Sequence, residues 1–341
     1  MVMNGKTILI TGGTGSFGQA FVGHLLSKYK KIKKIVIFSR DELKQFNMEK
    51  LYPIHKYPCM RYFIGDVRDK SRLQMAFREV DIVVHAAALK QVGIGEYNPT
   101  ESVKTNINGS QNIIEAALDS NVQKVVALST DKAVSPVNLY GATKLCSEKL
   151  FIAAYNLKGF KKINFSVVRY GNVMGSRGSV LPYFLKLYEQ GIESLPLTDE
   201  AMTRFNLSLQ DASKVVEKII LKESSHFNGE IFIPKLVNFL IKDLVEAIDS
   251  KLKYNIVGIR PGEKIHEELI NMEESKKSLE FKDSFLIYPN LDLDDVSKLS
   301  KKTKGKNSIR QFSYNSSSSK FRMSVAELRR VINQYKTEKK I

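Results

Sequence analysis

The sequence predicts an α/β protein built on a doubly wound parallel sheet, with a smaller C-terminal lobe. Two observations support this prediction. Strand and helix patterns alternate along residues 1–170, and a glycine-rich turn joins the first expected strand to the first expected helix. After Tyr170 the alternation breaks into shorter segments. We therefore expect a sheet domain over residues 1–170 and a second lobe over residues 171–341, interleaved with late elements of the sheet.

Short apolar runs predict the strands, and segments with an apolar period near 3.6 residues predict the helices. The expected strands are 7–11, 34–39, 61–65, 81–86, 123–129 and 164–170. The expected helices between them are 17–29, 42–51, 70–79, 100–121 and 140–157. In the second lobe we expect helices at 179–190, 209–224, 240–253, 263–272 and 324–338. The serine run Ser316–Ser319 is expected to form a flexible loop.

Composition limits the class of protein. The chain has 341 residues, enough for a large core and two lobes. It has no run of about 18 apolar residues, so we expect no membrane-spanning helix. The first expected strand begins near Lys6, which leaves no room for a signal peptide. The two cysteines, Cys59 and Cys146, give neither a disulfide framework nor a clustered metal site. We therefore expect a cytoplasmic protein without a bound metal.

The chain is strongly basic, with a formal net charge of +17. Its C-terminal tail is rich in lysine, and nucleic-acid binding is one interpretation of such a charge. A solvated basic surface is the other, and we favour it because the sequence contains no recognised nucleic-acid module. A positive field also steers an anionic nucleotide substrate toward its site. We expect neither a nucleic-acid nor a membrane partner.

The first turn has the features of a dinucleotide-binding site. The segment Thr11–Gly18 follows an apolar strand and precedes a helix. Glycines permit a tight turn and a close approach to a pyrophosphate, and the helix N-terminus offers free N–H groups. This indicates a Rossmann-like domain. The residues expected to contact the cofactor here are Gly12, Thr14, Gly15, Ser16, Phe17 and Gly18.

The end of the second strand bears on the choice of cofactor. Ser39, Arg40 and Lys44 together could hold the 2′-phosphate of NADP, whereas Asp41 provides a carboxylate that suits NAD. We favour NADP. The alternative is an ordinary helix cap with surface charge.

The third and fourth strands end in further candidate contacts. Asp66, followed by Val67, can accept a hydrogen bond from the adenine amino group or cap the next helix. Small residues after the fourth strand let the backbone approach a cofactor closely, and Lys90 then points into the crevice beyond the strands. The small residues are Ala86, Ala87 and Ala88. His85 is interpreted as a core residue.

A tyrosine and a lysine four residues apart form the candidate catalytic site. Tyr140 and Lys144 share one helix face, and a nearby ammonium group stabilises a phenolate. Just upstream, Thr130, Asp131 and Lys132 supply a hydroxyl, a carboxyl group and an amine. Together they predict oxidation of an alcohol, followed by acid–base chemistry on the neighbouring carbons.

Arginine beside glycine recurs in the second half, in the segments 169–172, 175–179, 202–205 and 258–264. A guanidinium group near free backbone N–H groups suits phosphate, so these segments predict a diphosphate-bearing substrate. The candidate substrate-binding residues are Lys90, Asn172, Arg177, Thr198, Arg204, Arg260 and Glu263.

The motifs resemble those of a known family. The pattern from Thr11 to Gly18, with Tyr140 and Lys144, resembles extended short-chain dehydrogenases/reductases. Longer strings resemble the inverting UDP-N-acetylglucosamine 4,6-dehydratases of bacterial pseudaminic acid synthesis. These strings are 39–45, 64–69, 85–90, 128–133, 138–144, 170–172 and 258–264. The resemblance covers residues 5 to 290 or so. The glycines at 93 and 95, the absence of tryptophan and the tail after residue 290 depart from the family pattern.

The resemblance implies a reaction and a role for each group. Tyr140 takes the proton of the 4-hydroxyl, Thr130 hydrogen-bonds the same oxygen, and Lys144 holds the cofactor ribose and lowers the pKa of Tyr140. Lys132, neutral because its pKa is depressed, removes the C5 proton, and protonated Asp131 donates to the departing 6-hydroxyl.

The implied substrate is UDP-N-acetylglucosamine, the implied cofactor is NADP, and the family implies a homo-oligomer. Three alternatives stay open. They are a retaining 4,6-dehydratase, a UDP-sugar 4-epimerase, which needs neither Asp131 nor Lys132, and a protein that binds without turnover.

Overall fold

A large sheet organises the computed structural model, which describes residues 3–222, 229–307, 310–318 and 320–339. The strand order is β15-β13-β14-β9-β6-β5-β4-β1-β2-β3. The strands from β3 to β9 are parallel, and β14, β13 and β15 extend the sheet with antiparallel pairing. The order reverses between β1 and β4, which creates the switch point at which ligands bind in such sheets.

The strands of the sheet are β1 (Thr7–Thr11), β2 (Lys34–Ser39), β3 (Met60–Ile64), β4 (Ile82–His85), β5 (Lys124–Thr130), β6 (Asn164–Tyr170), β9 (Ile231–Pro234), β13 (Ser278–Glu280), β14 (Ser284–Ile287) and β15 (Lys306–Asn307). The helices around it are α1 (Ser16–Lys28), α2 (Glu42–Leu51), α3 (Lys70–Ala76), α4 (Val92–Tyr97), α5 (Pro99–Val103), α6 (Gly109–Leu118), α7 (Leu139–Leu157) and α9 (Leu209–Leu221). A π-helical turn, Lys104–Asn108, joins α5 to α6.

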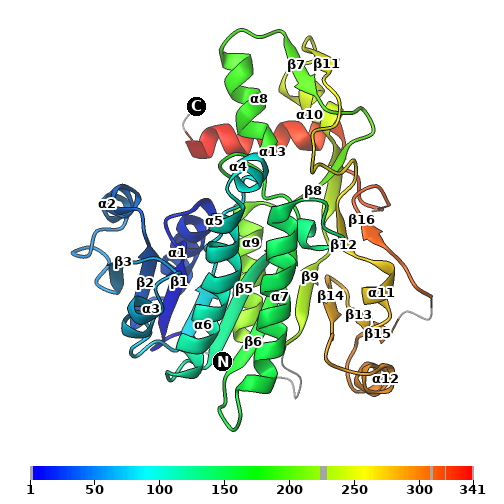
Figure 1. Cartoon of the computed structure of the whole chain (residues 1–341). Helices are drawn as coiled ribbons and strands as arrows, with labels where there is room; N and C mark the ends of the chain where they lie inside the picture. Colours follow the sequence, from blue (N-terminus) through cyan, green and yellow to red (C-terminus); the bar gives the residue numbers. More distant parts are fainter. Residues whose placement is uncertain (1–2, 223–228, 308–309, 319, 340–341) are drawn as a thin grey trace.

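Helices cover the sheet on both faces. The layer formed by α3, α6 and α7 lies in front of the strands in Figure 1, and α1 packs against α9. Right-handed crossovers on the two sides of the switch point place helices on opposite faces, which accounts for the two layers. Buried strands such as β1 and β2 have continuous apolar centres for this reason, Ile8–Ile10 and Ile35–Phe38.

A smaller lobe lies beyond the carboxyl ends of the parallel strands, at the top of Figure 1. It contains α8 (Val180–Glu189), β7 (Ser194–Leu197), β8 (Thr203–Asn206), β10 (Val237–Leu240), α10 (Ile241–Ile248), β11 (Lys253–Ile256) and α13 (Val325–Lys339). Below it lie β12 (Glu268–Ile270), α11 (Met272–Ser275) and β16 (Tyr314–Asn315), whereas α12 (Leu293–Lys302) packs beside β13 and β15 at the far end of the sheet. The lobe has an apolar cluster of its own, with Leu181, Phe184, Leu195, Phe239 and Leu244 among its members. None of the helices in the described residues is long and apolar enough to cross a membrane.

The structure confirms the predicted α/β architecture, and most predicted elements of the first half agree within three residues. The expected boundary between a sheet domain and a second lobe at residue 170 stays a proposal. The predicted helix over 263–272 is wrong, because Leu269 and Ile270 are buried in strand β12, which pairs with β16. Asn271 then caps α11 in a capping box with Glu274, so the helix begins only at Met272, the last residue of the predicted segment.

Two smaller expectations also need correction. The serine run lies in a turn with Ser317 and Ser318 exposed, but Ser316 is completely buried, and its hydroxyl lies 2.6 Å from that of Thr203. Ser319 lies outside the described residues. Arg169, taken from sequence as part of a phosphate-binding loop, is completely buried in β6. Its guanidinium donates to Glu148 Oε2 at 2.6 Å and to Glu274 Oε1 at 2.8 Å.

We expect Arg169→Leu to lower the free energy of unfolding by about 3–5 kcal/mol, because removing one partner leaves buried charge without compensation. Urea denaturation measures the loss. Lys214→Leu is the control, since Lys214 is 61% exposed in its pair with Asp211 and such pairs contribute at most about 1 kcal/mol. Equal denaturation midpoints for the two variants would show that the cluster around Arg169 adds no stability.

Candidate active site

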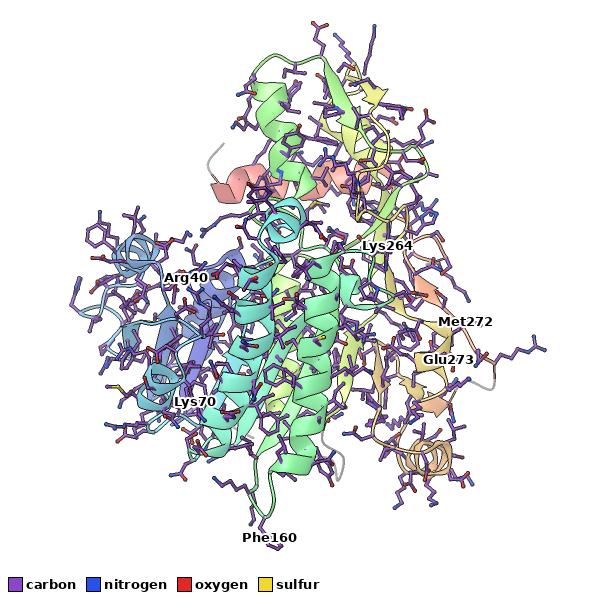
Figure 2. The ribbon with its side chains drawn as sticks, in the orientation of Figure 1. Arg40, Lys70, Phe160, Lys264, Met272 and Glu273 are labelled. Carbon is purple, nitrogen blue, oxygen red and sulfur yellow. The ribbon has the colours of Figure 1, made fainter. Side chains whose placement is uncertain are left out.

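A cavity of about 630 Å³ opens at the carboxyl ends of the parallel strands, at the predicted crevice. Figure 2 shows Arg40 on the side of α2 and Lys264 on the side of the smaller lobe. All of the predicted catalytic and cofactor-binding residues lie in the cavity wall, together with three of the predicted substrate residues. These are Gly12, Thr14, Gly15, Ser16, Phe17, Gly18, Ser39, Arg40, Lys44, Asp66, Val67, Ala86, Ala87, Ala88, Lys90, Thr130, Asp131, Lys132, Tyr140, Lys144, Asn172 and Arg177.

The glycine-rich turn leaves space that a side chain would fill. Gly12 has a positive φ of 65°, and a Cβ there would lie 2.8 Å from Ala87 Cα. The N-cap of α1, Gly15, makes no side-chain cap, and the first turn of α1 carries no acidic residue. The positive end of the helix dipole is therefore available to an anion. Arg177 lies over this turn, with its Nη2 donating to Thr14 O at 3.0 Å.

The basic residues after β2 are paired with carboxylates. Arg40 Nη1 lies 3.6 Å from Asp66 Oδ2, and Lys44 Nζ lies 2.6 Å from Asp41 Oδ2. Asp41 also caps α2, since its side chain accepts from the Lys44 backbone N–H. The helix-cap interpretation of this segment is thus correct for Asp41. It does not exclude a ligand, because Arg40 and Lys44 are about half exposed and line the cavity.

The predicted catalytic residues come from two adjoining elements, the end of β5 and the start of α7. Thr130 donates to Asp131 Oδ1 at 2.9 Å, and Lys132 Nζ donates to the same oxygen at 3.1 Å. Gly141 explains how α7 packs so closely here, because a Cβ at this position would lie 2.1 Å from the Lys132 carbonyl oxygen. The glycine after Tyr140 therefore brings the phenol to the Asp131–Lys132 segment.

Burial changes the acidity of this cluster. Desolvation raises the pKa of Asp131, which favours the protonated acid that the sequence predicted. Desolvation also raises the pKa of Tyr140 to about 12, against the lowering effect of the Lys132 charge and of a hydrogen bond with Thr130. For Lys132 the expectation was wrong. Burial lowers its pKa, but the charges of Asp131 and Glu267 outweigh burial and hold the pKa above the usual value. The resting amine is charged.

Lys144 was expected to lower the pKa of Tyr140, but its amine has another partner. Its Nζ donates to the Leu128 carbonyl at 2.7 Å, and desolvation lowers its pKa to about 8, with Glu148 opposing. The positive charge that lowers the pKa of Tyr140 is that of Lys132, not that of Lys144. The expected contact of Lys144 with a cofactor ribose stays a prediction.

Several buried polar atoms in the wall have no hydrogen-bond partner among the described residues. They are Thr105 Oγ1, Ser129 Oγ, Asp131 Oδ2, Asn172 Oδ1 and Ser179 Oγ. Buried polar atoms in native proteins are almost always paired, so such a group on one cavity wall indicates a polar ligand that supplies the partners.

The remaining predicted substrate residues lie outside the cavity wall. Thr198 donates to Glu263 Oε2 at 3.4 Å, and the Arg260 backbone N–H donates to the same oxygen at 3.4 Å. Arg204 is buried and donates to the carbonyls of Thr203 and Ile265. These four residues stay predictions.

Glu267 is the site residue that the sequence analysis missed. It is 2% exposed, and its Oε1 lies 2.9 Å from Lys132 Nζ. It falls inside the segment predicted as helix 263–272, and no motif singles it out. Only the folding of this segment onto β5 identifies it.

Comparison with known proteins identifies the family. Residues 8–289 match the model of a family described as polysaccharide biosynthesis protein. The chain belongs to this family.

Two family relatives support the more specific resemblance. Two proteins of Campylobacter jejuni named UDP-N-acetylglucosamine 4,6-dehydratase (inverting) are 54% and 51% identical to the chain. The first match covers 86% of both chains, and the second covers 97% of this chain and 98% of the relative. A Rickettsia massiliae protein named UDP-glucose 4-epimerase is 43% identical over 83% of this chain and 82% of its own. The crystal structure of Pen from Bacillus thuringiensis is similar across 98% of this chain and all of its own, with 36% identity and a TM-score of 0.85.

Proposed function

We propose that the protein is a UDP-N-acetylglucosamine 4,6-dehydratase that inverts C5. Its product would be UDP-2-acetamido-2,6-dideoxy-L-arabino-hex-4-ulose. The observation that supports this most directly is the joint placement of Tyr140, Asp131 and Lys132 on one cavity wall. Oxidation of an alcohol needs only the tyrosine, whereas loss of water from C5 and C6 needs a further acid and base.

The cavity suits NAD(P). The space above Gly12 and the uncapped start of α1 fit a pyrophosphate, and the small residues Ala86 to Ala88 permit a flat ring to approach. The chemistry that a nicotinamide supplies when bound is to accept hydride from sugar C4 and return it to C6. We assign the ribose contact to Lys144.

The proton transfers fall to four side chains. Tyr140 takes the proton of the 4-hydroxyl, and Thr130 holds the same oxygen. Once C4 is a ketone the C5 proton is acidic. Lys132 removes it after its amine, charged at rest, has lost a proton. Asp131, whose protonated form burial favours, donates to the 6-hydroxyl as it leaves as water. Asn172 and Arg177 are assigned to the UDP-sugar, since both line the cavity and the Asn172 side-chain oxygen is buried with no partner among the described residues.

NMR spectroscopy of the protein incubated with UDP-N-acetylglucosamine tests the proposal. A C6 methyl signal beside a hydrated 4-keto centre supports a dehydratase, and a galacto-configured product would support an epimerase instead. No turnover would support binding alone. The epimerase is a second candidate because of the Rickettsia relatives, but Asp131 and Lys132 would then have no role in the reaction.

We further propose NADP as the cofactor, because Ser39, Arg40 and Lys44 all line the cavity. We expect the protein to bind NADP more tightly than NAD, and Arg40→Ala to narrow the difference by about tenfold through loss of a charge-assisted hydrogen bond. Calorimetric titration of each cofactor measures both affinities. Arg61→Ala is the control, since Arg61 donates to the Pro58 carbonyl and does not line the cavity. Equal affinities in the parent protein would make Asp41 the deciding residue.

We also propose that the protein acts in the cytoplasm, as its composition predicts, and that it forms a homo-oligomer, as the family resemblance implies. Light scattering of the purified protein measures its mass in solution. The mass of a single chain would exclude the homo-oligomer.

A further inference from the structure

We propose that Asn138 is a positioning residue for the substrate, because it joins the loop 258–264 to the start of helix α7 and so holds this loop in its binding conformation. The inference rests on the proposed function, since the loop is predicted to bind the diphosphate of the UDP-sugar. Asn138 does not line the cavity. It acts on the substrate only through the loop.

The side chain of Asn138 makes two short hydrogen bonds. Its Oδ1 accepts from the Gly141 N–H at 2.7 Å and caps α7, and its Nδ2 donates to the Gly262 carbonyl at 2.7 Å. Only one orientation of the amide satisfies both partners, because Gly141 offers a donor and Gly262 an acceptor. Aspartate and serine cap a helix about as well as asparagine does, so capping alone does not require an amide. The amide nitrogen serves the second contact.

Residues 260–263 form a tight turn that presents this carbonyl to Asn138. The Glu263 N–H donates to the Arg260 carbonyl at 3.0 Å, and Gly262 has a φ of 78°. Proline at the second position and a glycine with positive φ at the third are typical of a type II turn. A Cβ on Gly262 would lie 3.0 Å from Asn138 Cβ, so the turn packs directly against the cap of α7.

The same turn carries the arginine that was predicted to bind the substrate. Arg260 is exposed, and its guanidinium has no hydrogen-bond or ion-pair partner among the residues that the structure describes. Its backbone N–H donates to Glu263 Oε2 at 3.4 Å, which leaves the whole side chain available to a phosphate. The place of this guanidinium is therefore set by how the turn is docked, and not by contacts of its own.

Two further contacts dock the chain that follows the turn against residues 131–138, which join β5 to α7. Lys264 Nζ donates to the Val134 carbonyl at 2.7 Å, and Glu267 Oε1 forms the 2.9 Å ion pair with Lys132. Because Lys132 lines the cavity, these contacts hold the loop at the rim of the cavity. Of the three contacts, the one made by Asn138 lies in the turn itself.

Asn138→Asp separates docking of the loop from capping of the helix. Aspartate keeps an oxygen for the Gly141 N–H, but it replaces the donor with a second oxygen that faces the Gly262 carbonyl. We expect the KM for UDP-N-acetylglucosamine to rise about tenfold through loss of this hydrogen bond. The single-turnover rate of nicotinamide reduction at saturating substrate and the thermal midpoint should stay near those of the parent protein.

Asn138→Ala loses the cap as well as the contact with the loop. Tyr140 is the second residue of α7, so an uncapped first turn should also disturb the phenol. We expect this variant to show the same rise in KM, together with a lower thermal midpoint and slower reduction at saturating substrate.

Hydrogen–deuterium exchange of residues 258–264 measures docking of the loop without any turnover. We expect exchange in this segment to be about tenfold faster in Asn138→Asp than in the parent protein when no substrate is present. UDP-N-acetylglucosamine should slow exchange in both proteins, and the variant should need a higher concentration for the same protection.

Asn271→Asp is the matched control. Asn271 caps α11, with its Oδ1 accepting from the Glu274 N–H at 2.8 Å, and its amide nitrogen has no hydrogen-bond partner within the described part of the chain. An unchanged KM or unchanged exchange of residues 258–264 in Asn138→Asp would overturn the inference, and so would an equal rise in KM in Asn271→Asp. A parent protein that neither reduces its nicotinamide nor protects the loop on addition of UDP-N-acetylglucosamine would instead refute the proposed function, and the inference with it.

Discussion

Tyr140→Phe is expected to lose the oxidation of the substrate at C4 almost completely. The phenol is the base that takes the 4-hydroxyl proton, and general-base catalysis contributes about 10²–10⁴-fold to a rate. Phenylalanine keeps the ring and its packing, so cofactor binding should persist. Single-turnover absorbance of the reduced nicotinamide, followed after addition of UDP-N-acetylglucosamine, measures this step separately from the loss of water.

The pKa of Tyr140 adds a second expectation. Because burial raises the pKa to about 12, the phenolate is a minor species at neutral pH, and its fraction increases with pH. The parent oxidation rate should therefore rise from pH 6 to pH 9 or so, and the residual rate of Tyr140→Phe should lose this dependence. Tyr62→Phe is the control, since Tyr62 Oη donates to the Tyr52 carbonyl in the outer part of the sheet. Oxidation by Tyr140→Phe at the parent rate would remove Tyr140 from the mechanism.

The first half of the chain could be predicted well because its signals are local. Apolar runs fix β1 to β6, the turn from Gly12 to Gly18 fixes the start of α1, and the carboxyl ends of parallel strands necessarily meet at one edge. The cavity wall follows from these facts alone. The residues that line the cavity could thus be predicted from sequence, although the distances between them could not.

The charge states of the site could not be predicted in the same way. The pKa of Lys132 depends on Glu267, which is far away in sequence and reaches β5 only through the fold. The apolar residues at 265, 269 and 270 have a spacing that suits a helix, and the pairing of β12 with β16 overrides it. An arginine two residues before Gly171 suggested phosphate binding. Arg169 instead lies in buried strand β6, and its guanidinium donates to Glu148 and Glu274. Local patterns do not show which face of a strand is covered.

Lys132→Ala should keep cofactor binding and the oxidation at C4, and lose the removal of water. Without the amine no base reaches C5, so we expect product formation to fall by about 10²–10⁴-fold. The 4-keto intermediate and reduced nicotinamide should then accumulate together. This variant should not recover at high pH, because it has no amine to deprotonate. Lys214→Ala, on the exposed face of α9, is the control.

The configuration at C5 of the product made by the parent protein is a second test of the role of Lys132. A lysine that exchanges its protons with solvent can allow C5 to be reprotonated on the opposite face, and water beside it can do the same. We therefore expect the product to have the L-arabino configuration and, in D₂O, to carry deuterium at C5. NMR coupling constants of the first product formed give the configuration. A D-xylo product at early times, or full activity in Lys132→Ala, would refute the role of Lys132 and support a retaining dehydratase, in which another group returns the proton to the face from which it was taken.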